Sequence, residues 1–265
     1  MDASEARLSN VCAAAMLPHA TARHRIFNVH VDPFNADEAI ATILGWCRSG
    51  QTEIVVNPNL DCVVKLLEYP QLADVYDDAG LVLVDGWPLS VWSRLRGRAI
   101  PRVAGSDLMV PLCRAAARER FSVFLFGTTL ESLAGAARVL VQAIPDLDIA
   151  GVYSPPYGFQ HSAEETDMAL DVINRAAPSI IFLALGAPKQ EFWAQSVRSR
   201  IRANGLVCVG ASIDFLSGRV ARAPHVFRML YLEWFWRVLI EPRRLAPRYL
   251  RLIAALPSLV WSYGR

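Results

Sequence analysis

Two hydrophobic periods alternate along most of the chain and predict strands followed by helices. Short apolar runs predict buried strands, and apolar residues spaced three or four positions apart predict amphipathic helices. The predicted strands are Phe27–Val31, Glu53–Val56, Leu81–Val84, Phe121–Phe126, Ile149–Val152, Ser179–Leu185 and Leu206–Val209. The predicted helices are Ala36–Arg48, Leu60–Glu68, Ser106–Arg118, Leu130–Ile144, Ala163–Ala176 and Pro188–Arg202. Alternation at this interval predicts an α/β fold with a parallel sheet covered by helices on both faces.

The pattern changes at about Gly218, where arginine and aromatic residues become dense. From there on, nine arginines and two glutamates leave a net charge of +7, so the rest of this +2 chain carries −5. Pro224–Ile240 predicts an amphipathic helix that Pro242 and Pro247 end, and a shorter apolar stretch follows. We therefore divide the chain into a leader (1–25), a Rossmann-like α/β core (26–218) and a helical C-terminal appendage (219–265).

The appendage has the composition of a surface that meets an anionic partner. Apolar and aromatic residues interleaved with arginine suit an anionic membrane leaflet, and the same composition would serve a subunit interface in a homo-oligomer. Nucleic acid fits less well, because the rest of the chain is acidic. The N-terminus does not resemble a signal peptide, and no uncharged run reaches the ~18 residues that a transmembrane helix needs. The expected location is cytoplasmic and peripheral to the inner membrane.

Asp85 is the first candidate for chemistry. It follows the predicted strand Leu81–Val84, precedes Gly86, and has no basic neighbour in sequence. Ligands of open α/β sheets bind beyond the carboxyl ends of the strands, so Asp85 occupies a position suited to catalysis. Ordinary turn chemistry would also explain an Asp-Gly pair after a strand.

Two strand–helix junctions, at Gly127 and Gly186, direct helix N-termini towards the same crevice. Neither junction has the Gly-x-Gly-x-x-Gly pattern of a dinucleotide site, which argues against a dehydrogenase, and no P-loop is present. Free N–H groups at a helix N-terminus still suit a phosphate. Lys189, Gln190 and Glu191 lie in the first turn of the helix after Gly186, where the lysine and the glutamine could bind such a ligand or simply cap the helix.

No metal site is expected. The one Asp-x-Asp pair, Asp146 and Asp148, precedes a strand and so lies at the opposite end of the sheet from the crevice. The five cysteines are scattered, an odd number without metal-ligand spacing, and fit a reducing compartment. Arginines would then have to neutralise any phosphate charge.

Seven ordered sequence blocks together resemble the WecG/TagA/CpsF family of bacterial glycosyltransferases. The resemblance covers residues from about Phe27 to Tyr249, and no single block is as specific as their order. The blocks are Asn57–Asp61; Asp85–Pro88; Arg102–Leu108; Gly186–Glu191; Val209–Gly210 with Asp214–Phe215; Arg222–Pro224; and Glu233–Arg237 with Glu241–Arg243 and Arg248–Tyr249.

The resemblance implies inverting, metal-independent transfer of a sugar from a UDP-sugar to a polyprenyl-diphosphate-linked sugar, without a cofactor. Asp85 would be the general base that takes the proton of the acceptor hydroxyl. The residues implied to line the nucleotide-sugar crevice are Asn57, Asn59, Arg102, Gln190, Gly210 and Asp214. Those implied to stabilise the departing diphosphate are Arg237, Arg243, Arg244 and Arg248.

The donor sugar is left open by one departure from the family pattern. Many members have threonine where this chain has Asn57, a position near the sugar. The variants Asn-Leu-Asp and Asp-Gly-Trp-Pro are closer to the exopolysaccharide branch, which includes glucosyltransferases, than to the N-acetylmannosamine branch. A catalytically silent scaffold that binds nucleotide-sugar at the membrane is the alternative hypothesis.

Overall fold

The computed structural model describes residues 22–220, 227 and 233–263, and it has the α/β architecture that the sequence predicts. Six strands form one sheet in the order β4-β3-β8-β7-β5-β6, and every pairing is parallel. The strands are β3 (Glu53–Val56), β4 (Leu81–Val82), β5 (Val123–Gly127), β6 (Ile149–Tyr153), β7 (Ile180–Ala184) and β8 (Gly205–Cys208). Parallel strands bring all their carboxyl ends to one edge, which is where the candidate residues gather.

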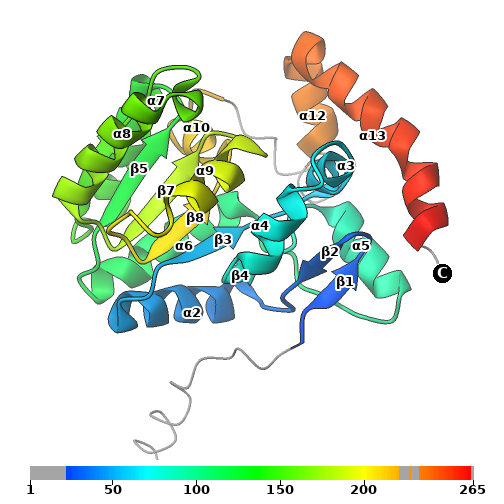
Figure 1. Cartoon of the computed structure of the whole chain (residues 1–265), viewed down its shortest axis with the longest axis horizontal. Helices are drawn as coiled ribbons and strands as arrows, with labels where there is room; N and C mark the ends of the chain where they lie inside the picture. The colour runs from blue at the N-terminus through cyan, green and yellow to red at the C-terminus, as the bar shows by residue number, and fades with distance from the viewer. Residues whose placement is uncertain (1–21, 221–226, 228–232, 264–265) are drawn as a thin grey trace, which may run out of the picture.

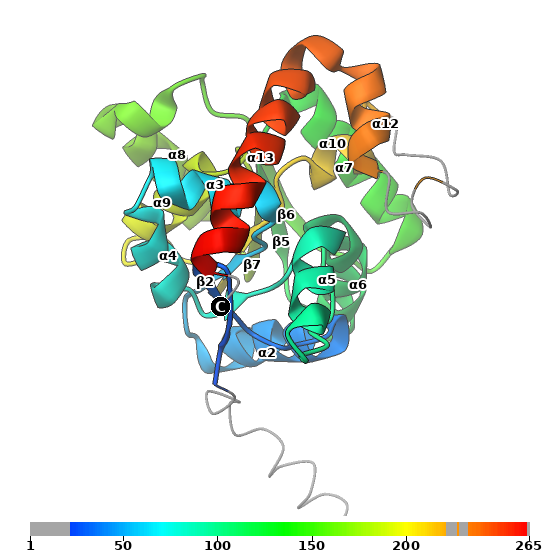
Figure 2. The ribbon, with the colours of Figure 1, turned by 90° about the vertical axis from the view of Figure 1, so that its right-hand side faces the viewer.

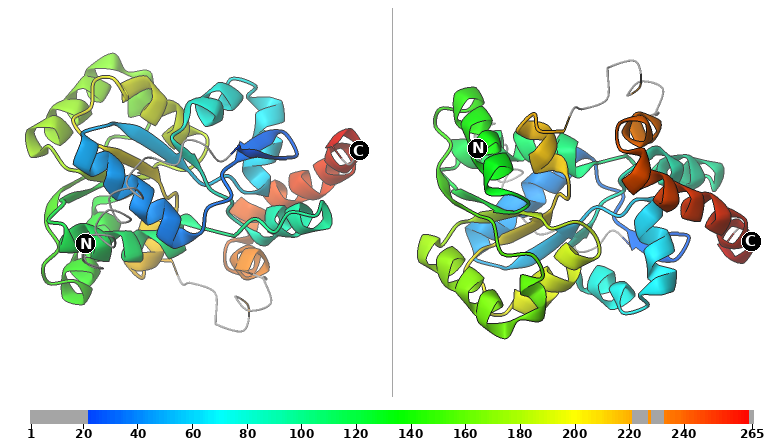
Figure 3. Two further views of the ribbon diagram at one scale, coloured as in Figure 1. Left: turned by 90° about the horizontal axis from the view of Figure 1, so that it is seen from below. Right: turned by 90° about the horizontal axis from the view of Figure 1, so that it is seen from above.

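Helices cover both faces of this sheet, as Figures 1 and 3 show. One face packs against α2 (Ala36–Ser49), α6 (Gly105–Arg118), α7 (Leu130–Ala143) and α10 (Ser212–Leu216). The other packs against α3 (Leu60–Glu68), α4 (Leu72–Asp78), α8 (Ala163–Ala176) and α9 (Lys189–Val197). The sheet therefore separates two hydrophobic clusters, as the near-continuous apolar strands require.

The two clusters take alternate residues of each strand. In β3, Ile54 and Val56 face one cluster and Val55 the other; in β7, Ile181 and Leu183 oppose Ile180 and Phe182. Side chains alternate across a strand, so these runs are apolar at every position. This explains why an apolar run marks β3, whose predicted bounds match the structure; the predicted bounds of the helices α3 and α8 match as well.

Three predicted bounds were wrong. The strand predicted over Phe27–Val31 is an antiparallel hairpin of β1 (His24–Ile26) and β2 (Val29–Val31), because Phe27 adopts a left-handed φ of 53° and reverses the chain. The helix predicted to reach Arg202 ends at Val197. The Leu81 strand is assigned over only two residues, although Leu83 N still donates to Val56 O at 2.9 Å.

The prediction that Pro247 ends a helix was also wrong. Pro242 is the first residue of α13 (Pro242–Tyr263), where a proline is tolerated, but Pro247 lies inside this helix. Buried Leu245, Leu252 and Leu259 hold α13 against the protein on either side of the proline. The preceding helix is described as α12 (Glu233–Ile240); the rest of the predicted Pro224–Ile240 helix, Phe227 excepted, lies outside the described residues.

The helix α5 (Trp87–Leu95) and the 3-10 turn η1 (Phe159–His161), like α4 and α10, were not predicted. In α5, Pro88 occupies one of the first two helical positions, where its missing N–H costs nothing and its fixed φ favours the helix. This helix begins directly after Asp85-Gly86 and therefore fixes the turn that carries the candidate base.

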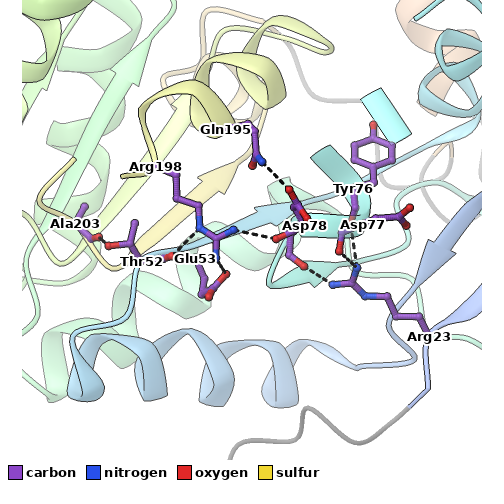
Figure 4. Close-up of polar contacts among 10 residues, drawn as sticks. Arg23, Thr52, Glu53, Tyr76, Asp77, Asp78, Gln195, Arg198 and Ala203 are labelled. Carbon is purple, nitrogen blue, oxygen red and sulfur yellow. Dashed lines mark hydrogen bonds and ion pairs between the residues drawn. The ribbon is translucent and has the colours of Figure 1, made fainter. Parts of the chain in front are cut away.

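Two arginines secure the C-terminal end of α4, the segment that leads into β4 (Figure 4). Arg23 donates to the carbonyl oxygens of Tyr76, Asp77 and Ala79. From the other side, Arg198 donates to Asp78 O and Thr52 O and pairs with Glu53. These carbonyls have no partner within their helix, and cationic donors there also complement the helix dipole.

The helix α13 crosses the molecule close to the N-terminus of α3 (Figure 2). Leu252 and Leu259 join the cluster that contains α3, and Tyr249 and Tyr263 pack beside it. The appendage is thus docked on the core at the carboxyl end of β3. On its outer face, Leu250, Ile253 and Trp261 are exposed.

Candidate active site

The Asp85 turn is attached to the turn that follows β3. Asp85 N donates to Pro58 O at 2.9 Å, so the β3–β4 pairing continues past the ends of both strands. Gly86 has a φ of 83°, which favours glycine, and a Cβ there would lie 3.7 Å from Asn59 Cβ. Half-buried Asp85 therefore lies at the carboxyl edge of the sheet, beside the Asn57–Asn59 turn.

Asn57 connects this turn to the segment that carries Arg102. Asn57 Nδ2 donates to Val103 O at 2.8 Å, and Val103 N donates to Val84 O at 2.8 Å. Asn57 Oδ1 is buried and has no protein partner. Arg102 itself is exposed, and its Nη2 lies 2.5 Å from Asp107 Oδ2.

Asn59 caps α3. Its side-chain oxygen accepts hydrogen bonds from the backbone N–H groups of Asp61 and Cys62, at 3.0 and 3.2 Å. Such caps stabilise a helix by about 1 kcal/mol. This oxygen is therefore engaged in orienting the turn next to Asp85.

Gln190 joins the turns after β7 and β8. Gly210 N donates to Gln190 Oε1 at 3.2 Å, and Gln190 Nε2 donates to Glu191 Oε1 at 3.1 Å. Gln190 is buried, and both ends of its amide are bonded within the protein. The start of α6, which follows Arg102, packs against the turn after β8, because a Cβ on Gly105 would lie 3.2 Å from Val209 Cα.

Asp214, in the short helix α10, faces the carboxyl end of β5. Thr128 Oγ1 donates to Asp214 Oδ1 at 2.7 Å, and Ser154 Oγ donates to Thr128 O at 2.6 Å. The turns after β5, β6 and β8 are thereby joined. Together, these contacts arrange the predicted binding residues of the core along one edge of the sheet.

Glu191 is the most unusual titratable group beneath this edge. It is buried, and its Oε2 has no hydrogen-bond partner. Burial raises the pKa of its carboxyl above the usual value, and the amide of Gln190 and the charge of Lys65 oppose that shift. Burial also raises the pKa of the nearby Cys62 thiol to about 11, so this thiol is not an activated nucleophile.

The sequence model of the glycosyl transferase WecG/TagA/CpsF family matches residues 24–265, nearly the whole chain. The chain belongs to this family. It is therefore a glycosyltransferase, as the order of its sequence blocks predicts.

Several relatives carry the enzyme name N-acetylglucosaminyldiphosphoundecaprenol N-acetyl-beta-D-mannosaminyltransferase. The chain is similar to the Bacillus spizizenii enzyme, with 31% identity over 191 residues that cover 72% of each chain. It is 28% identical to the Bacillus subtilis enzyme over 86% of this chain and 83% of that one. The Staphylococcus aureus enzyme is 27% identical over 85% and 87%.

The four arginines that the family resemblance assigns to the diphosphate differ in their surroundings. Arg248 Nη2 lies 2.9 Å from Asp61 Oδ2, so its guanidinium faces α3. Arg243 is exposed near the start of α13. The side chains of Arg237 and Arg244 lie outside the described residues.

Polar residues with defined partners at this edge were missed by the sequence interpretation. Asp61 and Lys65 lie in the helix that follows Asn59, Thr128 follows β5, and Glu191 was noted only as part of a helix start. The sequence did point to two of them, because Asp61 and Glu191 belong to two of the family blocks. Asp61, Lys65 and Thr128 each have a partner 86 or more residues away, which no local pattern specifies.

The described residues contain no group of three or more His, Cys, Asp or Glu side chains arranged to hold a metal ion. Asp146 and Asp148 are exposed in the turn before β6, at the opposite end of the sheet from Asp85, as predicted. Among the helices that the structure describes, none is both long and apolar enough to cross a membrane.

Proposed function

We propose that the protein is an inverting, metal-independent glycosyltransferase that moves a sugar from a UDP-sugar to a polyprenyl-diphosphate-linked sugar in surface polysaccharide biosynthesis. The observation that carries this proposal is the half-buried Asp85 at the carboxyl edge, backbone-bonded to the Asn57–Asn59 turn. The named relatives add support, because their acceptor is an N-acetylglucosaminyl-diphosphoundecaprenol.

Asp85 acts as the general base. It takes the proton from the acceptor hydroxyl while that oxygen forms a bond to the anomeric carbon of the donor. The bond between this carbon and the UDP oxygen breaks on the opposite face, and its electron pair leaves with the diphosphate. A positioned base of this kind contributes about 10² to 10⁴ in rate.

The leaving diphosphate is stabilised by arginines of the appendage in place of a metal ion. Guanidinium groups bind phosphate oxygens bidentately, and charge held where the leaving group develops lowers the barrier. We assign this role to Arg237, Arg243 and Arg244. Asn57, Asn59, Arg102, Gln190, Gly210 and Asp214 form the donor crevice, some through contact with the ligand and others by fixing its turns.

The appendage also holds the enzyme on the cytoplasmic leaflet of the membrane, where a polyprenyl-linked acceptor is found. Exposed apolar side chains on α12 and α13 support this, among them Leu239, Leu250 and Trp261 at 56%, 66% and 76%. Exposed Arg243 and Arg251 supply positive charge beside them. Such a combination binds anionic interfaces by burial of apolar area together with electrostatic attraction.

A transfer assay tests the proposed function. The full-length protein is incubated with radiolabelled UDP-glucose, UDP-N-acetylglucosamine or UDP-N-acetylmannosamine and a short-chain polyprenyl-diphosphate N-acetylglucosamine, with EDTA present. We expect one donor to label the lipid, with a β linkage, because the names of the relatives specify a β-linked product. UDP-glucose is included because the Asn57 block favours glucose as the alternative donor sugar. Absence of transfer from every donor, with UDP still bound, would favour the silent scaffold instead.

A further inference from the structure

Lys65 connects two parts of the site that are distant in the sheet. Its Nζ donates to Ala187 O at 2.7 Å and lies 2.8 Å from Asp61 Oδ2, one helical turn earlier in α3. The helix α3 follows β3, whereas Ala187 belongs to the turn after β7, and β8 lies between these strands. The lysine therefore bridges across β8 to the turn that leads into α9.

Asp61 holds a second cation, which comes from the appendage. Its carboxylate is 9% exposed and lies 2.8 Å from Lys65 Nζ and 2.9 Å from Arg248 Nη2 of α13. A carboxylate in the first turn of a helix is also stabilised by the helix dipole. Docking of α13 and the position of Lys65 thus depend on one buried carboxylate.

The turn that Lys65 reaches carries Gln190 and Glu191. Ala187 lies three residues before Gln190, whose N–H donates to Gly186 O across the turn and whose Oε1 accepts from Gly210 N. The charge of Lys65 also acts on Glu191, against the shift that burial causes in the pKa of Glu191. A continuous polar chain therefore runs from Arg248 through Asp61 and Lys65 to the turns after β7 and β8.

We propose that Lys65 and Asp61 are positioning residues that adjust the β7–α9 turn to the docking of α13. Arg248 acts in this chain through Asp61. The proposal rests on the proposed function, because this turn is taken as part of the donor crevice. With α13 docked, Asp61 divides its charge between two cations and Lys65 remains on the Ala187 carbonyl. With Arg248 withdrawn, Asp61 attracts Lys65 alone, and the turn loses its restraint.

The chain supplies a matched control on the same two helices. Arg251 Nη1 of α13 lies 3.4 Å from Glu68 Oε1 of α3, and both side chains are largely exposed. This pair also joins α13 to α3, but among the contacts of the described residues Glu68 is bonded to Arg251 and not to the β7–α9 turn. Arg251→Met therefore removes one docking ion pair and leaves the polar chain intact.

Hydrogen exchange of the full chain without nucleotide tests the coupling directly. In Lys65→Met we expect the amides of residues 186–192 and Gly210 to exchange about tenfold faster, as loss of a charge-assisted hydrogen bond predicts. Arg248→Met should speed the same amides about threefold, because Asp61 then draws Lys65 away from the Ala187 carbonyl. Lys65→Arg should restore protection, Arg251→Met should leave it unchanged, and the β5 and β7 amides should stay protected throughout.

Two results would overturn the coupling. One is wild-type exchange at residues 186–192 in Lys65→Met; the other is equal acceleration by Arg251→Met and Arg248→Met, which would indicate general loosening of α13. Titration with UDP then separates the two proposals. If the wild-type protein fails to bind UDP, the proposed donor is wrong, and the exchange result still decides the coupling. If the wild type binds UDP, the variants should lose UDP affinity in the same order in which they lose protection from exchange.

Discussion

The turns at the carboxyl edge of the sheet and the outer helix α13 are held in different ways. The turns are joined by backbone and buried amide contacts, such as Asp85 N to Pro58 O and Gly210 N to Gln190 Oε1. The helix α13 is held by a few buried leucines and by ion pairs to α3, and much of its length is exposed. Local opening is expected first where few apolar contacts are buried.

This difference fits the two tasks that we propose. The base and the donor-side turns must keep their geometry within fractions of an ångström, so they lie on the core. The element that meets a lipid-linked acceptor must admit and release it, so it lies on a segment with fewer buried contacts. The same comparison shows why Asp61 matters, since it belongs to the core and holds the appendage.

For the appendage, the largest expected effect is a loss of membrane binding, and it comes from the outer face of α13. Replacing Leu250, Ile253 and Trp261 together by glutamate removes three exposed apolar groups and adds three negative charges. Because each buried apolar side chain and each charge is worth about 1 kcal/mol or more at an anionic interface, binding to phosphatidylglycerol vesicles should fall about a hundredfold or more. Vesicle co-sedimentation measures this.

The control for this variant carries glutamates at Leu130 and Met168, which are exposed at 61% and 56% on α7 and α8. Equal loss of vesicle binding in both proteins would remove α13 as the membrane surface. Removal of all residues after about Gly218 is a less selective test, because it would also uncover the core around Leu252 and Leu259.

A smaller effect concerns the buried core beneath the turns. Burial raises the pKa of Glu191 above its ordinary value of 4.5, so the unfolded chain loses this proton at lower pH than the folded one. Glu191 therefore contributes a stability that is present below about pH 4.5 and is lost as pH rises through the folded pKa. Glu191→Gln keeps the acceptor for Gln190 and removes this titration.

Urea unfolding of the wild type and of Glu191→Gln at pH 5 and pH 8 measures the effect. We expect the variant to gain free energy of unfolding relative to the wild type as pH rises, with Glu164→Gln, at an exposed position in the first turn of α8, as the control. A difference between the two proteins that does not change with pH would contradict the assignment of a raised pKa.

The alternation of strands and helices could be predicted because both faces of the sheet are buried, which makes every strand an apolar run. The capping box at Asn35 and Glu38 is likewise a local device: Asn35 Oδ1 accepts from Glu38 N and Glu38 Oε2 accepts from Asn35 N. Local contacts of this kind leave a readable pattern.

Features set by distant partners could not be predicted. The helix α13 continues through Pro247, and leucines on both sides of this proline are buried, packing that no propensity rule includes. The proximity of Gln190 to Gly210, or of Lys65 to Ala187, follows only from the strand order. The sequence blocks predicted candidate site residues, but not which of them bond to each other.

The comparison of acceptor transfer by wild-type and Asp85→Asn protein tests the central claim most directly, once a donor has been identified. Asparagine preserves the shape of the side chain and cannot take a proton. The account predicts that kcat falls by about 10² to 10⁴, while the affinity for UDP, measured by calorimetry, stays close to that of the wild type. Turnover like that of the wild type, or a parallel loss of UDP binding, would contradict Asp85 as the base.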